Sequence, residues 1–432
     1  MKFISLGALA LLTAAPIFAG SAAAAEAPVL GKGSYGQYLV EWAAATHADL
    51  AAISLYATPP GKTAAVSIAS RGGEVGTPAP RDAEAVGKSG RAHFAMDRGR
   101  HRLVAELPLA DMSDKPAGVL SLVLHSAGKS EAVLKAEAYA IRNAISRRTS
   151  YTANLLQPES YDPNVPVHSY AQHLVDAALD RHRDVLILAI HASMPKNSDP
   201  EILASNIGRI GKKADDDDMR VVRDGKTNLE VNKGLMRYEV ELPLNDVSGT
   251  RIGALGVVFP LDAHTDQQAR HQEAIGIRDE ISRRILTPGN LVESWPYDPH
   301  YSDHTYAQWL VDRTLARDPG ILVLALHVTP PDSKTNIILA SNIGRIGKVA
   351  DSDDMSVVNT GKPDMAVNKE GNRFEAELAL RDAQGRQVGA VSVVYAYKPG
   401  VDKQMLQRKA QAVADALARE IPGAAALFKP RG

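Results

Sequence analysis

The nonapeptide ASNIGRIGK occupies residues 204–212 and recurs without a change at residues 340–348. The offset between the two copies is 136 residues, and the same offset relates YDP at 161–163 to YDP at 297–299. A repeat of this length corresponds to a whole domain, because the repeats of solenoid proteins span only about 20 to 50 residues. The chain therefore contains at least two copies of one module.

A third, more divergent copy precedes these two. With an offset of 135 residues, SYGQ at 34–37 corresponds to SYAQ at 169–172, and ELPL at 106–109 corresponds to a second ELPL. Where the later copies carry the repeated loop, the first copy reads SRGGEVGT at 70–77, which keeps two glycines and loses the basic residues. Copies two and three thus share a constraint on the sequence of this loop, and the first copy lacks that constraint.

The middle copy predicts the element order of the module. Tyr238, Val240 and Leu242 alternate with polar residues, which is the period of a half-buried strand. The predicted elements are an amphipathic helix at 169–181, strands at 185–190 and 202–204, a hairpin of strands at 237–244 and 251–259, and a closing helix at 265–285. This order predicts an α+β fold with three tandem modules, each an antiparallel sheet flanked by N- and C-terminal helices.

The N-terminus predicts export. Lys2 is followed by an apolar stretch that ends near Phe18 and by small residues up to Ala25, which is the pattern of a cleaved signal peptide. We therefore expect a periplasmic or secreted protein. The predicted division is a signal peptide at 1–25 and modules at 26–157, 158–292 and 293–432, with boundaries in segments rich in Pro and Asn.

Composition excludes several classes of protein. The chain has no cysteine, so it forms neither disulfides nor thiolate metal sites. Its net charge is −1, and this balance predicts no nucleic-acid partner. After the signal peptide no uncharged run approaches the roughly 20 residues that span a bilayer, so we predict no transmembrane segment in the mature chain.

Several segments of the second copy resemble the extracellular Cache sensor domain, a relative of PAS domains. These segments are LAS at 203–205, IGRIGK at 207–212, YEVELPLND at 238–246 and GTRIGA at 249–254. In that family the module binds a small ligand, such as an amino acid or carboxylate, between its sheet and its long loop. The resemblance therefore implies a pocket in each of copies two and three, with copy one as a structural or partner-binding domain. Because no signalling segment follows, it also implies a separate membrane receptor or transporter as the partner.

The repeated loop and the hairpin strand supply the predicted ligand-binding residues. Glycine-flanked backbone donors beside cationic side chains suit a carboxylate or phosphate, and a strand arginine offers two parallel donors. The alternative is that the glycines only satisfy turn geometry and the cations form ion pairs. The predicted ligand-binding residues are Ser205, Asn206, Arg209, Lys212 and Arg237, with their equivalents Ser341, Asn342, Arg345, Lys348 and Arg373.

Metal binding is a competing hypothesis, although we predict no cofactor. His191 and His327 end equivalent strands and could ligate a metal or haem iron. The acidic runs add the candidates Asp215, Asp217, Asp351 and Asp353, but they lack the glycine turn and final glutamate of a calcium loop. A helix N-terminus explains these runs better. Asp246, before a turn that contains glycine, is predicted to accept local backbone hydrogen bonds.

No catalytic template fits the chain. The sequence GKGSYG at 31–36 matches a dinucleotide-binding pattern, but it follows the signal peptide and not a strand. We therefore predict that the chain is not an enzyme but an exported sensor or carrier that binds a small anionic or zwitterionic molecule. The alternatives are an envelope metal- or haem-binding protein and an interaction scaffold without a small ligand.

Overall fold

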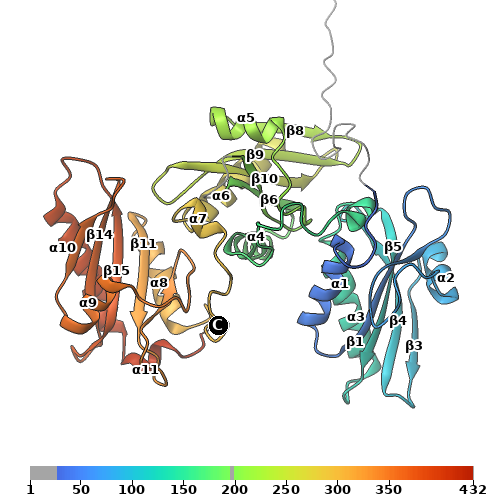
Figure 1. Ribbon diagram of the computed structural model, residues 1–432, viewed down its shortest axis with the longest axis horizontal. Coiled ribbons are helices and arrows are strands. Elements are labelled where there is room, and N and C mark those ends of the chain that lie inside the picture. Colours follow the sequence, from blue (N-terminus) through green and yellow to red (C-terminus); the bar gives the residue numbers. More distant parts are fainter. Residues whose placement is uncertain (1–26, 195–198, 432) are drawn as a thin grey trace, which may run out of the picture.

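The computed structural model describes residues 27–194 and 199–431, and these residues form three five-stranded antiparallel sheets. Each sheet has its five strands in the spatial order 2-1-5-4-3, counted within the module. Figure 1 shows the modules one after another, with the second between the first and the third. The predicted α+β fold of three tandem modules is confirmed. The predicted signal peptide lies outside the described residues.

The first module packs its helices α1 and α3 against one face of its sheet. Tyr35, Leu39 and Val40 of α1 are fully buried there, together with Leu134 and Ile141 of α3. The elements are α1 (Tyr35–Thr46), β1 (Leu50–Ala57), β2 (Val66–Arg71), α2 (Arg81–Ser89), β3 (His93–Asp97), β4 (Arg102–Ala110), β5 (Pro116–His125), α3 (Glu131–Ser146) and the 3-10 helix η1 (Thr152–Leu156).

The second module repeats this arrangement. Leu174 and Val175 of α4 pack with Ile277 and Ile281 of α6 on one face of the sheet, and α5 lies on the other side against β9 and β10. The elements are α4 (Tyr170–Arg181), β6 (Ile187–Ser193), β7 (Pro200–Ser205), α5 (Asp216–Asp224), β8 (Asn228–Asn232), β9 (Arg237–Asn245), β10 (Arg251–Pro260), α6 (Gln267–Ser282) and α7 (Pro288–Leu291).

The third module has the same order of elements. Leu310 and Val311 of α8 and Leu406 and Leu417 of α10 fill its core. The elements are α8 (Tyr306–Arg317), β11 (Ile321–Val328), β12 (Ile337–Ser341), α9 (Ser352–Thr360), β13 (Asp364–Val367), β14 (Arg373–Arg381), β15 (Gln387–Ala396), α10 (Lys403–Glu420) and α11 (Ala424–Leu427). The predicted module boundaries fall in segments between these elements and stay predictions.

The predicted elements of the second module omit the short edge strand β8 and the short helix α7. The short edge strand β8 was not predicted, because Leu229 and Val231 alternate with polar residues over only five positions and stay exposed. The acidic runs do begin helices: Asp215 caps α5 and Asp351 caps α9, each accepting two backbone N–H groups in a capping box. Asp246 accepts the backbone N–H groups of Ser248 and Thr250 at 2.8 and 3.0 Å, as predicted for a turn aspartate.

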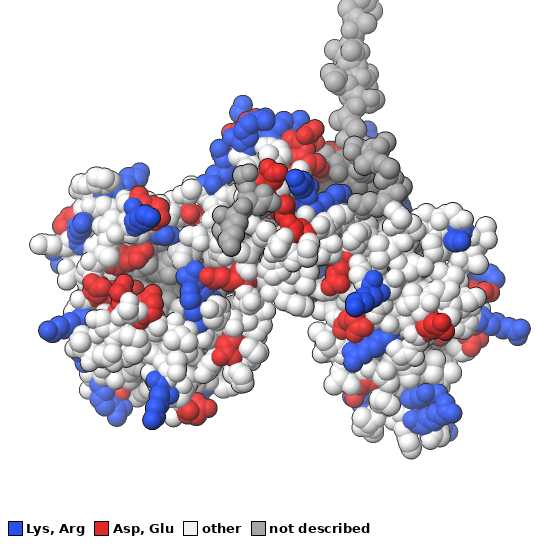
Figure 2. Space-filling model, in the orientation of Figure 1, with Lys and Arg blue, Asp and Glu red and all other residues white. Residues whose placement is uncertain are grey.

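Two surface features bear on partners. Among the described residues, no helix combines the length and the apolar character needed to cross a bilayer. Figure 2 shows acidic and basic side chains interspersed over the visible face of all three modules, with no broad area of one sign. Recognition by this face therefore depends on local sites and not on a large charged surface.

Candidate functional site

The repeated loop of the second module lies against the first module. The Tyr35 hydroxyl donates to the Asn206 carbonyl at 2.8 Å, and the Asn206 amide nitrogen donates to the Arg147 carbonyl at 3.2 Å. Asn154, in η1, donates to the carbonyl of Ile207 at 3.0 Å. The loop is therefore a docking element between modules.

The third module docks on the second through the same contacts. The Tyr170 hydroxyl donates to the Asn342 carbonyl at 3.1 Å, and Asn342 donates to the Arg283 carbonyl at 2.8 Å. Asn290 donates to the carbonyl of Ile343 at 3.1 Å. One packing geometry is thus used at both junctions, which explains why the two loops are identical.

The arginines of the two loops take part in this docking. Arg209 is 4 % exposed, and its guanidinium donates to the Tyr151 hydroxyl at 2.7 Å and to the Gln157 side chain at 3.2 Å. Arg345 forms a two-pronged ion pair with Glu293, with contacts of 2.8 to 3.1 Å. These donors face protein groups, while the ligand-binding function of both residues stays a prediction.

The strand arginines also reach the preceding module. Arg237 donates to the hydroxyl and carbonyl of Ser150 at 2.9 and 2.8 Å, and Arg373 donates to the Leu286 carbonyl at 3.3 Å. Burial lowers the pKa of Arg237. The ammonium of Lys212 lies 5.8 Å from the ring centre of Tyr161, and Lys348 is half-buried. Of the predicted residues, the structure thus places Asn206, Arg209 and Arg237 at the first junction and Asn342, Arg345 and Arg373 at the second.

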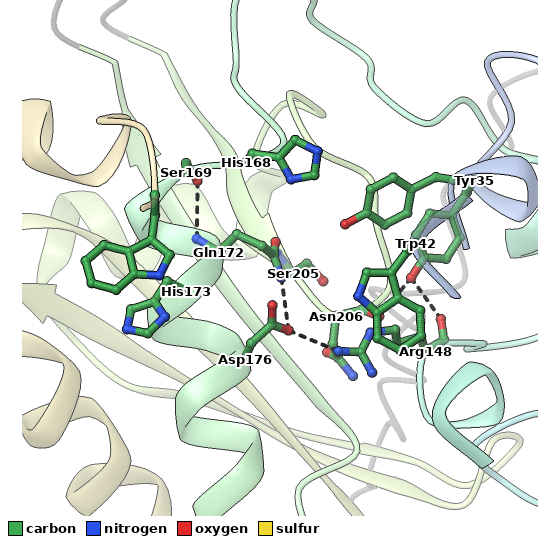
Figure 3. A pocket seen from close by; sticks show the side chains of 12 residues that line it. Tyr35, Trp42, Arg148, His168, Ser169, Gln172, His173, Asp176, Ser205 and Asn206 are labelled. Carbon is green, nitrogen blue, oxygen red and sulfur yellow. Dashed lines mark hydrogen bonds and ion pairs between the residues drawn. The ribbon is translucent and has the colours of Figure 1, made fainter. Parts of the chain in front are cut away.

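A cavity of about 190 Å³ opens at the first junction, and we name it the interface cavity (Figure 3). Ser205 and Asn206, at the start of the repeated loop, form part of its wall. Helix α1 contributes aromatic side chains, and helix α4 contributes polar ones. The remaining lining residues are Tyr35, Tyr38, Trp42, Arg148, His168, Ser169, Gln172, His173, Asp176 and Trp295.

Opposite charges lie side by side in the interface cavity. Arg148 donates to the Asp176 carboxylate at 3.4 Å, and Gln172 donates to the same carboxylate oxygen at 3.4 Å. The guanidinium of Arg148 stacks 4.2 Å from the ring centre of Trp42. Asp176 keeps 41 % of its side chain exposed, so its carboxylate remains accessible to a bound molecule. Burial raises the pKa of Asp176, and Arg148 opposes this rise.

Aromatic stacking closes the other end of the interface cavity. The rings of His173 and Trp295 are stacked with centres 4.0 Å apart. Burial lowers the pKa of His173 to about 4, although Asp303 acts in the opposite direction. His173 is therefore neutral near pH 7 and adds an uncharged, flat surface to the wall. Burial also raises the pKa of Tyr38 to about 12, which keeps its hydroxyl protonated.

The depressed pKa of His173 predicts a loss of stability in mild acid. The unfolded chain protonates this residue near pH 6.5, whereas the folded chain does so only near pH 4. Stability therefore falls as pH drops through this window, and His173 accounts for roughly 2 kcal/mol of the loss by pH 5. Urea unfolding at pH 7.5 and pH 5 should show a smaller difference for His173→Gln than for the native chain. The control is His168→Gln, at an exposed position. Equal pH dependence of the unfolding free energy in the native chain and both variants would contradict the expectation.

The second junction has a related but different hollow of about 380 Å³. Asn342, Arg284 and Asp312 lie there at the positions that correspond to Asn206, Arg148 and Asp176. The aromatic wall is missing, since Ala177 stands where the first junction has Trp42. The interface cavity is thus the more enclosed of two related sites.

The predicted histidines lie elsewhere, on the sheet face covered by α5 and α9. His191 Nδ1 lies 2.8 Å from Asp218 Oδ2, and His327 Nδ1 lies 3.1 Å from Asp354 Oδ2. In the described residues, the one group of three potential ligands close enough to share a metal ion is His327, Asp354 and Glu377. The candidates Asp215, Asp217, Asp351 and Asp353 are not part of this group. Asp215 and Asp351 cap helices, and Asp217 and Asp353 lie in the first turns of those helices.

Only some residues of the interface cavity and of the histidine–carboxylate clusters were predicted from the sequence. Arg148, Asp176 and Trp42 come from different modules, and no pattern in the chain signals their meeting. Asp218 had a usable signal. The second and third modules carry both the histidine and this aspartate, and the first module has Tyr56 and Ala83 at the two positions.

The comparisons with known proteins found no matching family model and no matching curated protein. Among solved structures, the chain is similar to the GAF domain of A. aeolicus nlh2, with 13 % identity, 27 % of this chain and 85 % of that chain covered, and a TM-score of 0.22. It is also similar to PelD from Pseudomonas aeruginosa PAO1, with 16 % identity, 56 % of this chain and 74 % of that chain covered, and a TM-score of 0.23. The chain is also similar to the Stigmatella aurantiaca phytochrome photosensory core module, with 12 % identity, 81 % of this chain and 82 % of that chain covered, and a TM-score of 0.21. The assignment of the fold rests on the sheets themselves: the strand order, found three times, is that of three tandem PAS/GAF-like modules.

Proposed function

We propose that this chain is an exported sensor or carrier with Cache-like modules, and that it binds a small zwitterionic molecule in the interface cavity. The observation that carries the proposal is the pairing of Arg148 with Asp176 on an aromatic-lined wall. An arginine recognises a carboxylate through parallel donors, and an aspartate recognises an ammonium group. An amino acid or a similar metabolite carries both groups.

The size and lining of the interface cavity support a small ligand. Its volume of about 190 Å³ is below the roughly 300 to 1,000 Å³ of pockets for drug-sized molecules. The ring of Trp42 offers a face to the apolar or cationic part of the ligand. The hydroxyl of Ser205 and the amide of Gln172 lie close by to orient it.

Binding at a junction gives the ligand a mechanical consequence. Tyr38 and Trp42 belong to the first module, whereas Gln172 and Asp176 belong to the second. A molecule held by both modules favours the relative orientation in which both sets of contacts form. A membrane receptor or transporter that recognises this orientation would respond to the ligand-bound chain. Export and the absence of catalysis are part of the proposal and rest on residues 1–25 and on the lack of a catalytic template.

Thermal unfolding against a panel of amino acids and organic acids tests the proposal. A ligand at a hundredfold excess over its Kd is expected to stabilise the native chain by roughly 2.7 kcal/mol, because it binds only the folded state. Arg148→Met should abolish the shift, since it removes the carboxylate partner and keeps much of the contact with Trp42.

Arg284→Met is the matched control, because Arg284 holds the corresponding place at the second junction. It should leave the ligand-induced shift unchanged. The proposal is wrong if no compound shifts the midpoint, or if the shift survives Arg148→Met and disappears in Arg284→Met.

A further inference from the structure

A buried cluster of one histidine and two carboxylates lies on the sheet of the third module, away from the interface cavity. His327 comes from β11, Asp354 from the first turn of α9 and Glu377 from β14. One potential ligand atom from each lies within 4.8 Å of the others. His327 and Asp354 are 3 % and 7 % exposed, so these polar groups are shielded from solvent.

The contacts around the cluster leave one ring nitrogen without a well-formed hydrogen bond. His327 Nδ1 faces Asp354 Oδ2 at 3.1 Å, but it forms no hydrogen bond of good geometry. The other ring nitrogen contacts the Ser392 hydroxyl at 2.9 Å, and this hydroxyl donates to Glu377 at 2.5 Å. Ser392 thus orients both the imidazole and the carboxyl group, as the outer partners of metal ligands do.

The second module keeps the three residue types as His191, Asp218 and Glu241. His191 Nδ1 again lacks a well-formed hydrogen bond and lies 2.8 Å from Asp218 Oδ2. Glu241 accepts a hydrogen bond from Asn228 at 3.0 Å. Among the described residues, however, only the third module brings one ligand atom from each of the three residues within reach of one ion.

The first module serves as an internal comparison. It keeps the glutamate as Glu106, which accepts a hydrogen bond from Ser121 at 2.8 Å. Tyr56 and Ala83 stand at the histidine and aspartate positions. The histidine and the aspartate are thus present together or absent together, as expected of two residues that contact each other.

We propose that the third module binds one divalent transition-metal ion of the Zn²⁺ class through His327, Asp354 and Glu377. An imidazole with two carboxylates suits such ions, whereas Ca²⁺ and Mg²⁺ prefer oxygen ligands alone. With bonds of about 2.0 to 2.2 Å, neighbouring ligand atoms around a tetrahedral Zn²⁺ lie roughly 3.3 to 3.6 Å apart, so the 3.1 Å between His327 Nδ1 and Asp354 Oδ2 needs to widen only slightly.

The ion would be structural. Its ligands tie helix α9 to strands β11 and β14 of the sheet that this helix covers, and its charge balances the two carboxylates. The competing arrangement has a proton shared between the two carboxyl groups in place of the ion. Counting bound metal separates the two arrangements.

The test is a calorimetric titration of Zn²⁺ into the full mature chain after treatment with a chelator, with Co²⁺ absorption as an independent readout of the ligand set. We expect one equivalent per chain and a rise in the unfolding midpoint. His327→Tyr introduces the residue that the first module carries at this position, and it should reduce the count to zero.

Glu106→Gln, in the first module, is the matched control and should leave one equivalent. Circular dichroism checks the fold of each variant, and Glu377→Gln replaces His327→Tyr if that variant does not fold. A folded native chain that takes up no Zn²⁺, or a count unaffected by both His327→Tyr and Glu377→Gln, would overturn the proposal. Because the amino-acid panel can be run in the presence of chelator, this result and the result for the interface cavity are distinguishable.

Discussion

Gly208→Ala is expected to destabilise the junction of the first and second modules by about 3 kcal/mol. A Cβ atom at this position would lie 2.5 Å from the ring of Tyr35, and the backbone has a φ of +72°. The ring cannot move aside, because Tyr35 is 2 % exposed and its hydroxyl is bonded to both modules. Overpacking of a rigid site costs roughly 1 to 3 kcal/mol, and the left-handed backbone adds about 1 to 2 kcal/mol.

Gly76→Ala separates the two contributions. Gly76 lies in the corresponding loop of the first module with a φ of +87°, and a Cβ atom there would meet nothing within 4 Å. This control should cost only the backbone contribution, about 1 to 2 kcal/mol. Urea unfolding of both variants measures the difference. Equal destabilisation would show that the contact with Tyr35 does not hold the modules together.

Arg237→Met is expected to cost about 2 to 4 kcal/mol. Arg237 is 3 % exposed, and its guanidinium satisfies the hydroxyl and carbonyl of Ser150 and also contacts the Ser113 hydroxyl. Removing the charged donor leaves the buried oxygen atoms of Ser150 without this partner. An unpaired buried polar group lowers the free energy of unfolding by more than the lost hydrogen bond had contributed. The same unfolding measurement detects the loss.

The control is Arg102→Met, because Arg102 starts the corresponding strand of the first module. It is 31 % exposed and pairs with Asp97 on the same sheet, so its loss should cost less than about 1 kcal/mol. If both variants lose the same stability, the interaction of Arg237 with the first module is not a major contribution to the junction.

These contacts explain why the first copy diverged. In the part of the chain that the structure describes, a Cβ atom at Gly73 or Gly76 of the first module's loop would meet no aromatic ring. Gly208 and Gly344 each face such a ring, Tyr35 and Tyr170. The constraint seen as a repeat in the sequence is therefore a docking constraint at two junctions.

Local patterns predicted most of the module. The alternation in residues 237–244 matched β9, and the acidic runs matched the starts of α5 and α9, because these features depend on neighbours in the chain. The edge strand β8 escaped prediction, since its alternating residues stay exposed and its pairing with β9 is what defines it.

The sequence by itself determined that the chain repeats one α+β module three times, because strand and helix periodicities and turn residues act over a few positions. Only the tertiary structure decided what the repeated residues contact. Arg209 and Arg237 turned out to reach the preceding module, and Arg148 meets Asp176 across a junction. His327, Asp354 and Glu377 converge from separate elements of one sheet layer. Such meetings depend on how whole modules and strands pack, and packing over this range leaves no periodic trace in the chain.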